Sequence, residues 1–135
     1  MSVSAYVKLY IITVPIFLII DLLWLGIIAR GFYRNKLDFI LSEQVNWMAA
    51  VIFYLIYIIG ILFFAIRPAI SSHSWMQALA LGALFGFFTY ATYDLTNFAT
   101  IKDWPLGIVI VDVIWGSFLC GFVSLSSYAL SKWIV

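Results

Sequence analysis

Four long apolar stretches, separated by short polar segments, constrain the fold of this 135-residue chain more than any other feature. Hydrophobic residues make up 66% of the sequence and charged residues 10%, whereas a soluble domain has about a quarter charged residues. About 20 helical residues cross the hydrocarbon core, and the backbone there must satisfy its own hydrogen bonds. The sequence therefore predicts an all-α integral membrane four-helix bundle with short loops. We expect a single domain, 1–135, with spans at 5–29, 46–66, 75–99 and 105–134.

Tryptophan and proline residues support these boundaries. Four tryptophans fall at span ends, as an interfacial aromatic belt predicts: Trp47, Trp75, Trp104 and Trp133. Pro68, directly after Arg67, is predicted to end the second span, because proline lacks the backbone N–H that continues a helix.

The longest connection, residues 30–45, carries apolar residues at helical spacing. These are Leu37, Ile40, Leu41 and Val45, with Asn35 as a candidate cap. The spacing is typical of a short interfacial helix between the first two spans. A polar loop with a few apolar anchors fits the same pattern.

Three of the six acidic residues lie inside predicted spans: Asp21, Asp94 and Asp112. An intramembrane carboxylate is costly and usually faces the protein interior, so it marks a candidate site. Asp21 and Asp112 are each followed three residues later by a tryptophan, Trp24 and Trp115, which shares their helical face. The predicted topology brings all three acids into the half of the bilayer away from the termini.

Other polar side chains lie at a similar depth, and together they predict a buried pocket. Its candidate ligand-binding residues are Asp21, Trp24, Tyr54, Tyr57, Tyr90, Tyr93, Asp94, Asn97, Asp112 and Trp115. Carboxylates would supply counter-charge to a small cation or amine, and indoles would supply cation–π faces. Neighbouring buried carboxylates cannot all ionise, so the cluster also suits protons. The alternative is that these groups only hydrogen-bond one another and hold the helices together.

Small residues in the third span predict a close helix contact. Ala78, Gly82 and Gly86 follow the small-xxx-small spacing that allows two backbones to approach. Gly116 and Gly121 in the fourth span are interpreted in the same way.

Few features favour catalysis. The single histidine, His73, lies in a short loop far from the acids, and no Cys/His metal set or phosphate-binding loop occurs. We therefore expect no cofactor, no metal site and no catalytic residue. The net charge of +1 and the lack of a basic stripe argue against nucleic-acid binding.

The run from Gly82 to Lys102, with Asp21-Leu-Leu-Trp24 and Asp112-Val-Ile-Trp115-Gly116, resembles an uncharacterised bacterial family of small predicted membrane proteins, a domain of unknown function. The resemblance covers essentially the whole chain, and Tyr90-Ala-Thr-Tyr93-Asp94-Leu-Thr-Asn97 is its most specific part. It implies four spans and a multi-pass protein of the bacterial inner membrane, and it transfers no activity.

These observations lead to one main functional hypothesis and two alternatives. The main hypothesis is a membrane protein that binds, and transports, a small cation, amine or proton through the Asp/Tyr/Trp pocket. The alternatives are an accessory subunit of a larger membrane complex and an enzyme that modifies a lipid. Because four helices enclose little space, a homodimer or larger complex is also expected.

Overall fold

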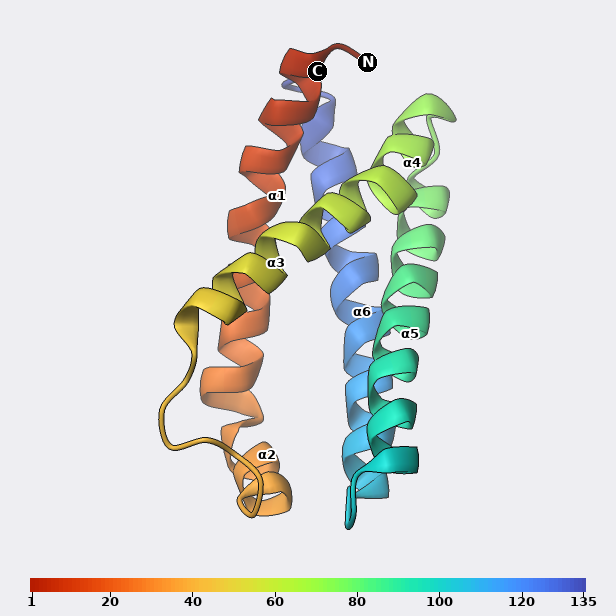
Figure 1. Cartoon of the computed structure of the whole chain (residues 1–135). Coiled ribbons are helices and arrows are strands. Elements are labelled where there is room, and N and C mark those ends of the chain that lie inside the picture. The colour runs from red at the N-terminus through yellow and green to blue at the C-terminus, as the bar shows by residue number, and fades with distance from the viewer.

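A computed structural model describes all 135 residues, and every regular element in it is helical (Figure 1). Both termini lie at one end of the bundle, and the short helix α2 and the turn between α5 and α6 lie at the other. Four helical segments are long and apolar enough to cross a membrane: Val3–Ile28, Trp47–Ser71, Trp75–Thr100 and Leu106–Ser131. The predicted all-α membrane bundle is therefore confirmed.

The chain forms eight successive helical elements, seven of them within the spans. The first contains α1 (Val3–Leu23) and a π-helical turn (Trp24–Ile28), followed by α2 (Arg30–Leu37). The second contains α3 (Trp47–Ile61), a π-helical turn (Leu62–Ile66) and α4 (Arg67–Ser71). The third and fourth are the single helices α5 (Trp75–Thr100) and α6 (Leu106–Ser131).

Side-chain caps start three of these helices. The Ser2 hydroxyl accepts a hydrogen bond from the Ala5 N–H, Asn46 Oδ1 accepts one from Ala49, and the Ser74 hydroxyl accepts one from Gln77. Each cap satisfies a backbone N–H that has no partner within its own helix.

The second span does not end at Pro68 as the sequence predicted, because α4 continues to Ser71. The π-helical turn Leu62–Ile66 comes immediately before Arg67 and Pro68. The hydrogen-bond register changes in such a turn, and this relieves the clash and the missing donor that proline brings to a regular helix.

The predicted short helix between the first two spans is present, but it begins earlier than the apolar spacing indicated. Asn35 lies inside α2, and the segment 38–46 is irregular. Ile40, Leu41 and Val45 are exposed there, whereas Leu37 is buried. Leu37 forms a small cluster with Trp104, Ile108 and Val109, so tertiary packing determines where this helix ends.

That cluster also corrects one assignment to the aromatic belt. Trp104 is only 8% exposed and packs against Leu37 of α2. Trp47, Trp75 and Trp133 are all more than half exposed. Trp104 is thus a packing residue, and the other three match the predicted interfacial positions.

Helices α5 and α6 run side by side along their length (Figure 1) and approach closely at glycines. A Cβ atom at Gly82 would overlap the carbonyl oxygen of Cys120, and one at Gly86 would overlap that of Gly116. The predicted small-residue contact is therefore confirmed. Gly116 also leaves room for the ring of Tyr90, which a Cβ atom there would meet.

Helix α3, in the second span, crosses the other helices obliquely (Figure 1). The main apolar core lies where α3 and its continuation pack against α1 and α6, and it contains Phe17, Ile58, Ile61, Leu119 and Val123 among its nine buried residues. The three intramembrane acids are not part of this core.

Candidate functional site

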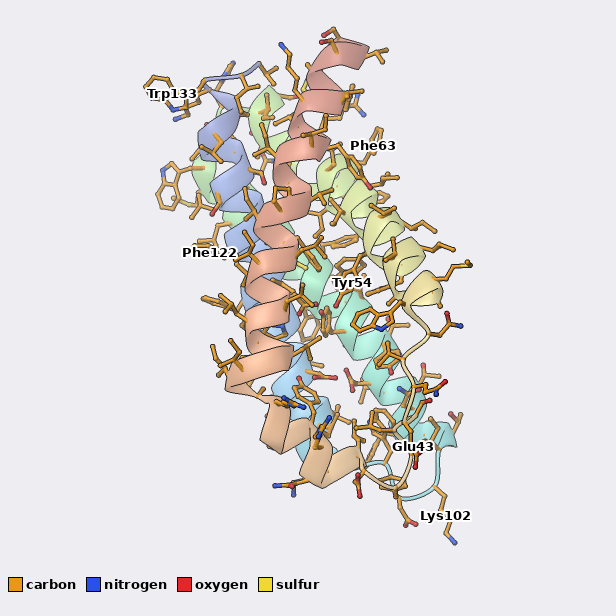
Figure 2. The ribbon with its side chains drawn as sticks, turned by 90° about the vertical axis from the view of Figure 1, so that its left-hand side faces the viewer. Glu43, Tyr54, Phe63, Lys102, Phe122 and Trp133 are labelled. Atoms are coloured by element: carbon orange, nitrogen blue, oxygen red, sulfur yellow. The ribbon has the colours of Figure 1, made fainter.

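Asp21, in the last turn of α1, joins three helices through its carboxylate. It is 3% exposed. The Tyr54 hydroxyl from α3 donates to Oδ2 at 2.8 Å, and the Trp115 indole N–H from α6 donates to Oδ1 at 3.1 Å. Figure 2 shows Tyr54 near the middle of the molecule, between Glu43 and Lys102 at one end and Phe63 and Trp133 at the other. Both Asp21 oxygens therefore have a neutral donor deep within the spans.

Asp112, one turn before Trp115 on α6, receives its hydrogen bond from α2. The Tyr33 hydroxyl donates to Asp112 Oδ1, and the Trp24 indole N–H donates to the Tyr33 oxygen at 3.2 Å. Burial, together with the hydrogen bond to Asp112, raises the pKa of Tyr33 above its ordinary value. Tyr33 therefore keeps its proton and remains a donor to the carboxylate.

The two Asp-x-x-Trp motifs meet through their tryptophans. The rings of Trp24 and Trp115 are stacked with centroids 4.3 Å apart and planes 8° from parallel. Trp24 is the first residue of a π-helical turn, in which the Ala29 N–H bonds to the Trp24 carbonyl, five residues back. Such turns often occur at functional sites, because they shift the direction of the side chains around them.

Asp94, on α5, is the least satisfied of the three acids. Its side chain has no exposed surface, and neither carboxylate oxygen receives a hydrogen bond from an N–H or O–H group. It lies beside the Asp112 carboxyl and the Trp104 indole. The indole N–H of Trp104 is also buried without a hydrogen-bond partner.

A cavity of about 820 Å³ opens among these groups. Its wall comes from both halves of the chain and is mostly hydrophobic: Asp21, Leu25, Tyr33, Phe53, Tyr54, Tyr57, Phe88, Thr89, Tyr90, Thr92, Tyr93, Asp112 and Trp115. The volume lies within the range of about 300–1,000 Å³ that is typical of small-molecule sites.

Most of the residues proposed from the sequence contribute to this wall. They are Asp21, Tyr54, Tyr57, Tyr90, Tyr93, Asp112 and Trp115. Three others lie outside it. Trp24 is covered by the ring of Trp115, Asp94 is buried beside Asp112, and Asn97 lies one turn further along α5.

Sequence reasoning missed Tyr33, whose hydroxyl donates a hydrogen bond to Asp112. Tyr33 lies in a segment interpreted as a connection, and no periodicity links it to a span. It also missed Leu25, Phe53 and Phe88, because apolar residues on a membrane helix carry no local signal that separates a cavity wall from a lipid contact. Thr89 and Thr92 are further omissions, and the Thr89 hydroxyl lies 2.7 Å from that of Tyr57.

The fold and the site define a class: a small four-span membrane protein with hydrogen-bonded carboxylates in the half of the bundle away from its termini. The chain belongs to the family described as Predicted membrane protein (DUF2177), whose model matches residues 6–129. The match includes every residue of the cavity wall. No curated protein and no solved structure matches the chain.

Proposed function

We propose that this protein binds an organic cation, specifically an amine with an apolar body, in the cavity between α1, α3, α5 and α6, and transports it in a bacterial inner membrane. The observation that carries the proposal is a largely apolar cavity of about 820 Å³ with two carboxylates in its wall. A bare inorganic cation would leave most of this volume and its apolar surface unused. An amine with an aromatic or aliphatic body uses both.

The charge balance of the site supports a cationic ligand. All seven Lys and Arg side chains are exposed, including Arg30, which follows the first span. The hydrogen-bond donors to Asp21 and Asp112 are neutral hydroxyl and indole groups. These donors solvate negative charge but do not cancel it, and charged groups within a membrane are usually paired. A bound cation would supply the missing partner.

Asp112 is the better direct ligand of the two acids. It is only partly buried, and the Tyr33 hydroxyl donates to one of its oxygens, Oδ1. Asp21 is almost fully buried, and each of its oxygens already has a donor. We therefore assign Asp112 to the ammonium contact and Asp21 to longer-range counter-charge.

The aromatic wall supports the same ligand class. Trp115, Tyr54, Tyr57 and Tyr90 border the cavity close to the acids. Faces of such rings attract cations within about 6 Å, and the attraction strengthens when water is excluded.

The rim of the cavity favours entry from the bilayer. Leu25, Phe53 and Phe88 belong to three different elements, line the cavity and are exposed. Because the helices that carry them span the membrane, their exposed surfaces face lipid tails. A ligand with an apolar body concentrates in the bilayer and can reach this opening sideways.

Calorimetric titration of the protein in lipid nanodiscs tests the proposal. The probes are phenethylamine, a cation at neutral pH, and phenethyl alcohol, which has the same body without the charge. We expect the amine to bind and the alcohol to bind at least about tenfold more weakly, because a hydrogen bond to a charged group contributes about 1.5–3 kcal/mol. Asp112→Asn should remove this preference, and Asp103→Asn, in the turn between α5 and α6, should leave it unchanged. Equal affinity for both probes, or a preference that survives Asp112→Asn, contradicts the proposal.

The alternative function is that of an accessory subunit of a larger membrane complex, in which Asp21 only holds helices together. The two interhelical hydrogen bonds of Asp21 favour this role. That role predicts that Asp21→Asn weakens folding and that the wild type does not distinguish the two probes.

A further inference from the structure

We infer that Asp94 and Asp112 hold one proton between them, so that the pair is a proton-binding site beside the cavity, with Asp94 as its buried member. The inference rests on the burial of Asp94 and on the packing of α5 against α6, and it does not depend on the identity of any ligand. Gly86 lies against Gly116, and Tyr90 lies against Gly116, so one turn further along this antiparallel pair Asp94 comes beside Asp112.

The first step is the position of Asp94. Its side chain has no exposed surface, and no N–H or O–H group donates to either oxygen. An ionised carboxylate in that position would have lost its water without gaining hydrogen bonds. A buried group in this situation takes up a proton and becomes neutral.

The second step is an account of the groups around Asp94. Helix α6 contributes the Asp112 carboxyl, which lies alongside, and the turn after α5 contributes the Trp104 indole. Helix α2 contributes Tyr33, whose hydroxyl already donates to Asp112. Helix α5 contributes two tyrosines, Tyr93 near both carboxyl groups and Tyr90 near Asp112. On α1, Asp21 adds negative charge near Asp112 and has its own two donors.

None of these neighbours is a cation, since every Lys and Arg side chain is exposed. Two carboxylates that lie side by side without a cation cannot both carry a charge, so the pair titrates as one unit with a shared proton. The same proton gives one of the two Asp94 oxygens a hydrogen bond, because a neutral carboxyl is an O–H donor to the neighbouring carboxylate.

The third step is the distribution of the proton within the pair. The Tyr33 hydroxyl donates to Asp112 and so favours its charged form. Asp94 has no such donor and is fully buried. The proton therefore resides mainly on Asp94, and the negative charge resides on Asp112, which faces the cavity. Moving the proton from the Asp94 oxygen to the Asp112 oxygen breaks one O–H bond, forms another and neutralises the carboxylate at the cavity wall.

Infrared spectroscopy of the protein at neutral pH tests this inference directly, because a protonated carboxyl has a C=O stretching band that a carboxylate lacks. The protein should be held in a maltoside detergent, which has no ester carbonyl. We expect about one protonated carboxyl per chain, with the downshift in heavy water that identifies an exchangeable acid proton. The band should disappear in Asp94→Asn and in Asp112→Asn, because in either variant the amide N–H₂ can donate to the remaining carboxylate.

Two matched controls are available. Asp21→Asn removes an acid that has two donors, and Asp103→Asn removes one in the turn after α5, so both variants should keep the band. Absence of the band in the wild type overturns the inference, even if a variant fails to fold. Persistence of the band in folded Asp94→Asn also overturns it. Neither result bears on the preference for phenethylamine, so the two proposals can fail separately.

Discussion

The indole of Trp24 stacks on that of Trp115 with ring centroids 4.3 Å apart, and hydrogen bonds link each indole N–H to the acid of the other Asp-x-x-Trp motif. Trp115 donates directly to Asp21, and Trp24 reaches Asp112 through the hydroxyl of Tyr33. The tryptophan of each motif therefore serves the acid of the other motif. This arrangement ties the end of the first span to the fourth and fixes both carboxylates at the cavity wall.

Replacing Trp115 with phenylalanine should destabilise the fold while leaving a ring in the stack. The substitution removes the only donor to Asp21 Oδ1, and a buried charged acceptor without a partner costs about 1–3 kcal/mol. Thermal unfolding in a maltoside detergent should therefore occur at a lower temperature. Trp133→Phe is the control, since that side chain is 87% exposed. Equal unfolding temperatures for the two variants would contradict the role of the Trp115 N–H.

Substitutions of the two cavity acids should have different effects on stability and on amine binding. Asp21→Asn leaves one amide oxygen and one amide N–H₂ facing two donors, so we expect a loss of about 1–3 kcal/mol in stability and a modest loss of amine affinity. Asp112→Asn should do the reverse, with affinity for phenethylamine reduced at least about tenfold and a smaller change in stability. Denaturant unfolding and calorimetric titration provide the two measurements. The opposite pattern would assign the ammonium contact to Asp21.

Binding of a permanent cation should weaken as the pH falls. Benzyltrimethylammonium does not itself titrate, so any change reports protonation of the protein. A second proton taken up by the Asp94–Asp112 pair neutralises the carboxylate that the cation contacts, and cation and proton then compete. Calorimetric titration across a pH series measures this effect, and a flat series with folded protein would show that no proton competes with the cation.

Tyr33→Phe should move this loss of affinity to a higher pH. The Tyr33 hydroxyl favours the charged form of Asp112, and its raised pKa keeps it a donor throughout the series. Without it, a proton competes more successfully for Asp112. Tyr10→Phe is a matched control, because its hydroxyl donates to the Leu55 carbonyl and not to an acid. The same pH series with the two variants makes the comparison, and coincident curves would exclude the effect.

The contact between α5 and α6 should be sensitive to a single methyl group. In Gly86→Ala the new Cβ atom overlaps the backbone carbonyl of Gly116, which cannot move without shifting the helix. We expect a loss of about 1–3 kcal/mol or more. Gly107→Ala is the control in the first turn of α6, where a Cβ atom meets nothing within 4 Å, so the substitution should stabilise the helix by no more than about 0.5–1 kcal/mol. Denaturant unfolding of both variants checks the opposite signs.

Much of the architecture follows from local features of the sequence. Four apolar runs predict four spans, because each run is long enough, at the fixed rise per residue of an α-helix, to cross the hydrocarbon core of a bilayer. The spacing of Ala78, Gly82 and Gly86 predicts a close contact, since a helix presents every fourth residue on one face. Asp21 and Asp112 could be assigned to the site because an acid within a span is exceptional in any membrane helix.

The connections were harder to predict, because their structure depends on distant partners. The end of α2 depends on the packing of Leu37 against Trp104 and Ile108. The continuation of the second span through Pro68 depends on a π-helical turn, for which no sequence pattern was recognised.

The sequence by itself therefore determined the class of protein, the number of spans and the half of the bundle that holds the acids. Only the tertiary structure decided which donor serves which acid. Helix α2 brings Tyr33 to Asp112 across 79 residues of sequence, and Trp24, at the start of a π-helical turn, donates to the same Tyr33 hydroxyl. The tertiary structure also showed that Asp94, unlike Asp21 and Asp112, does not line the cavity. Helical periodicity specifies the face on which a residue lies, but hydrogen-bond partners depend on how each helix is rotated against its neighbours, and that rotation is set by the packing of the whole bundle.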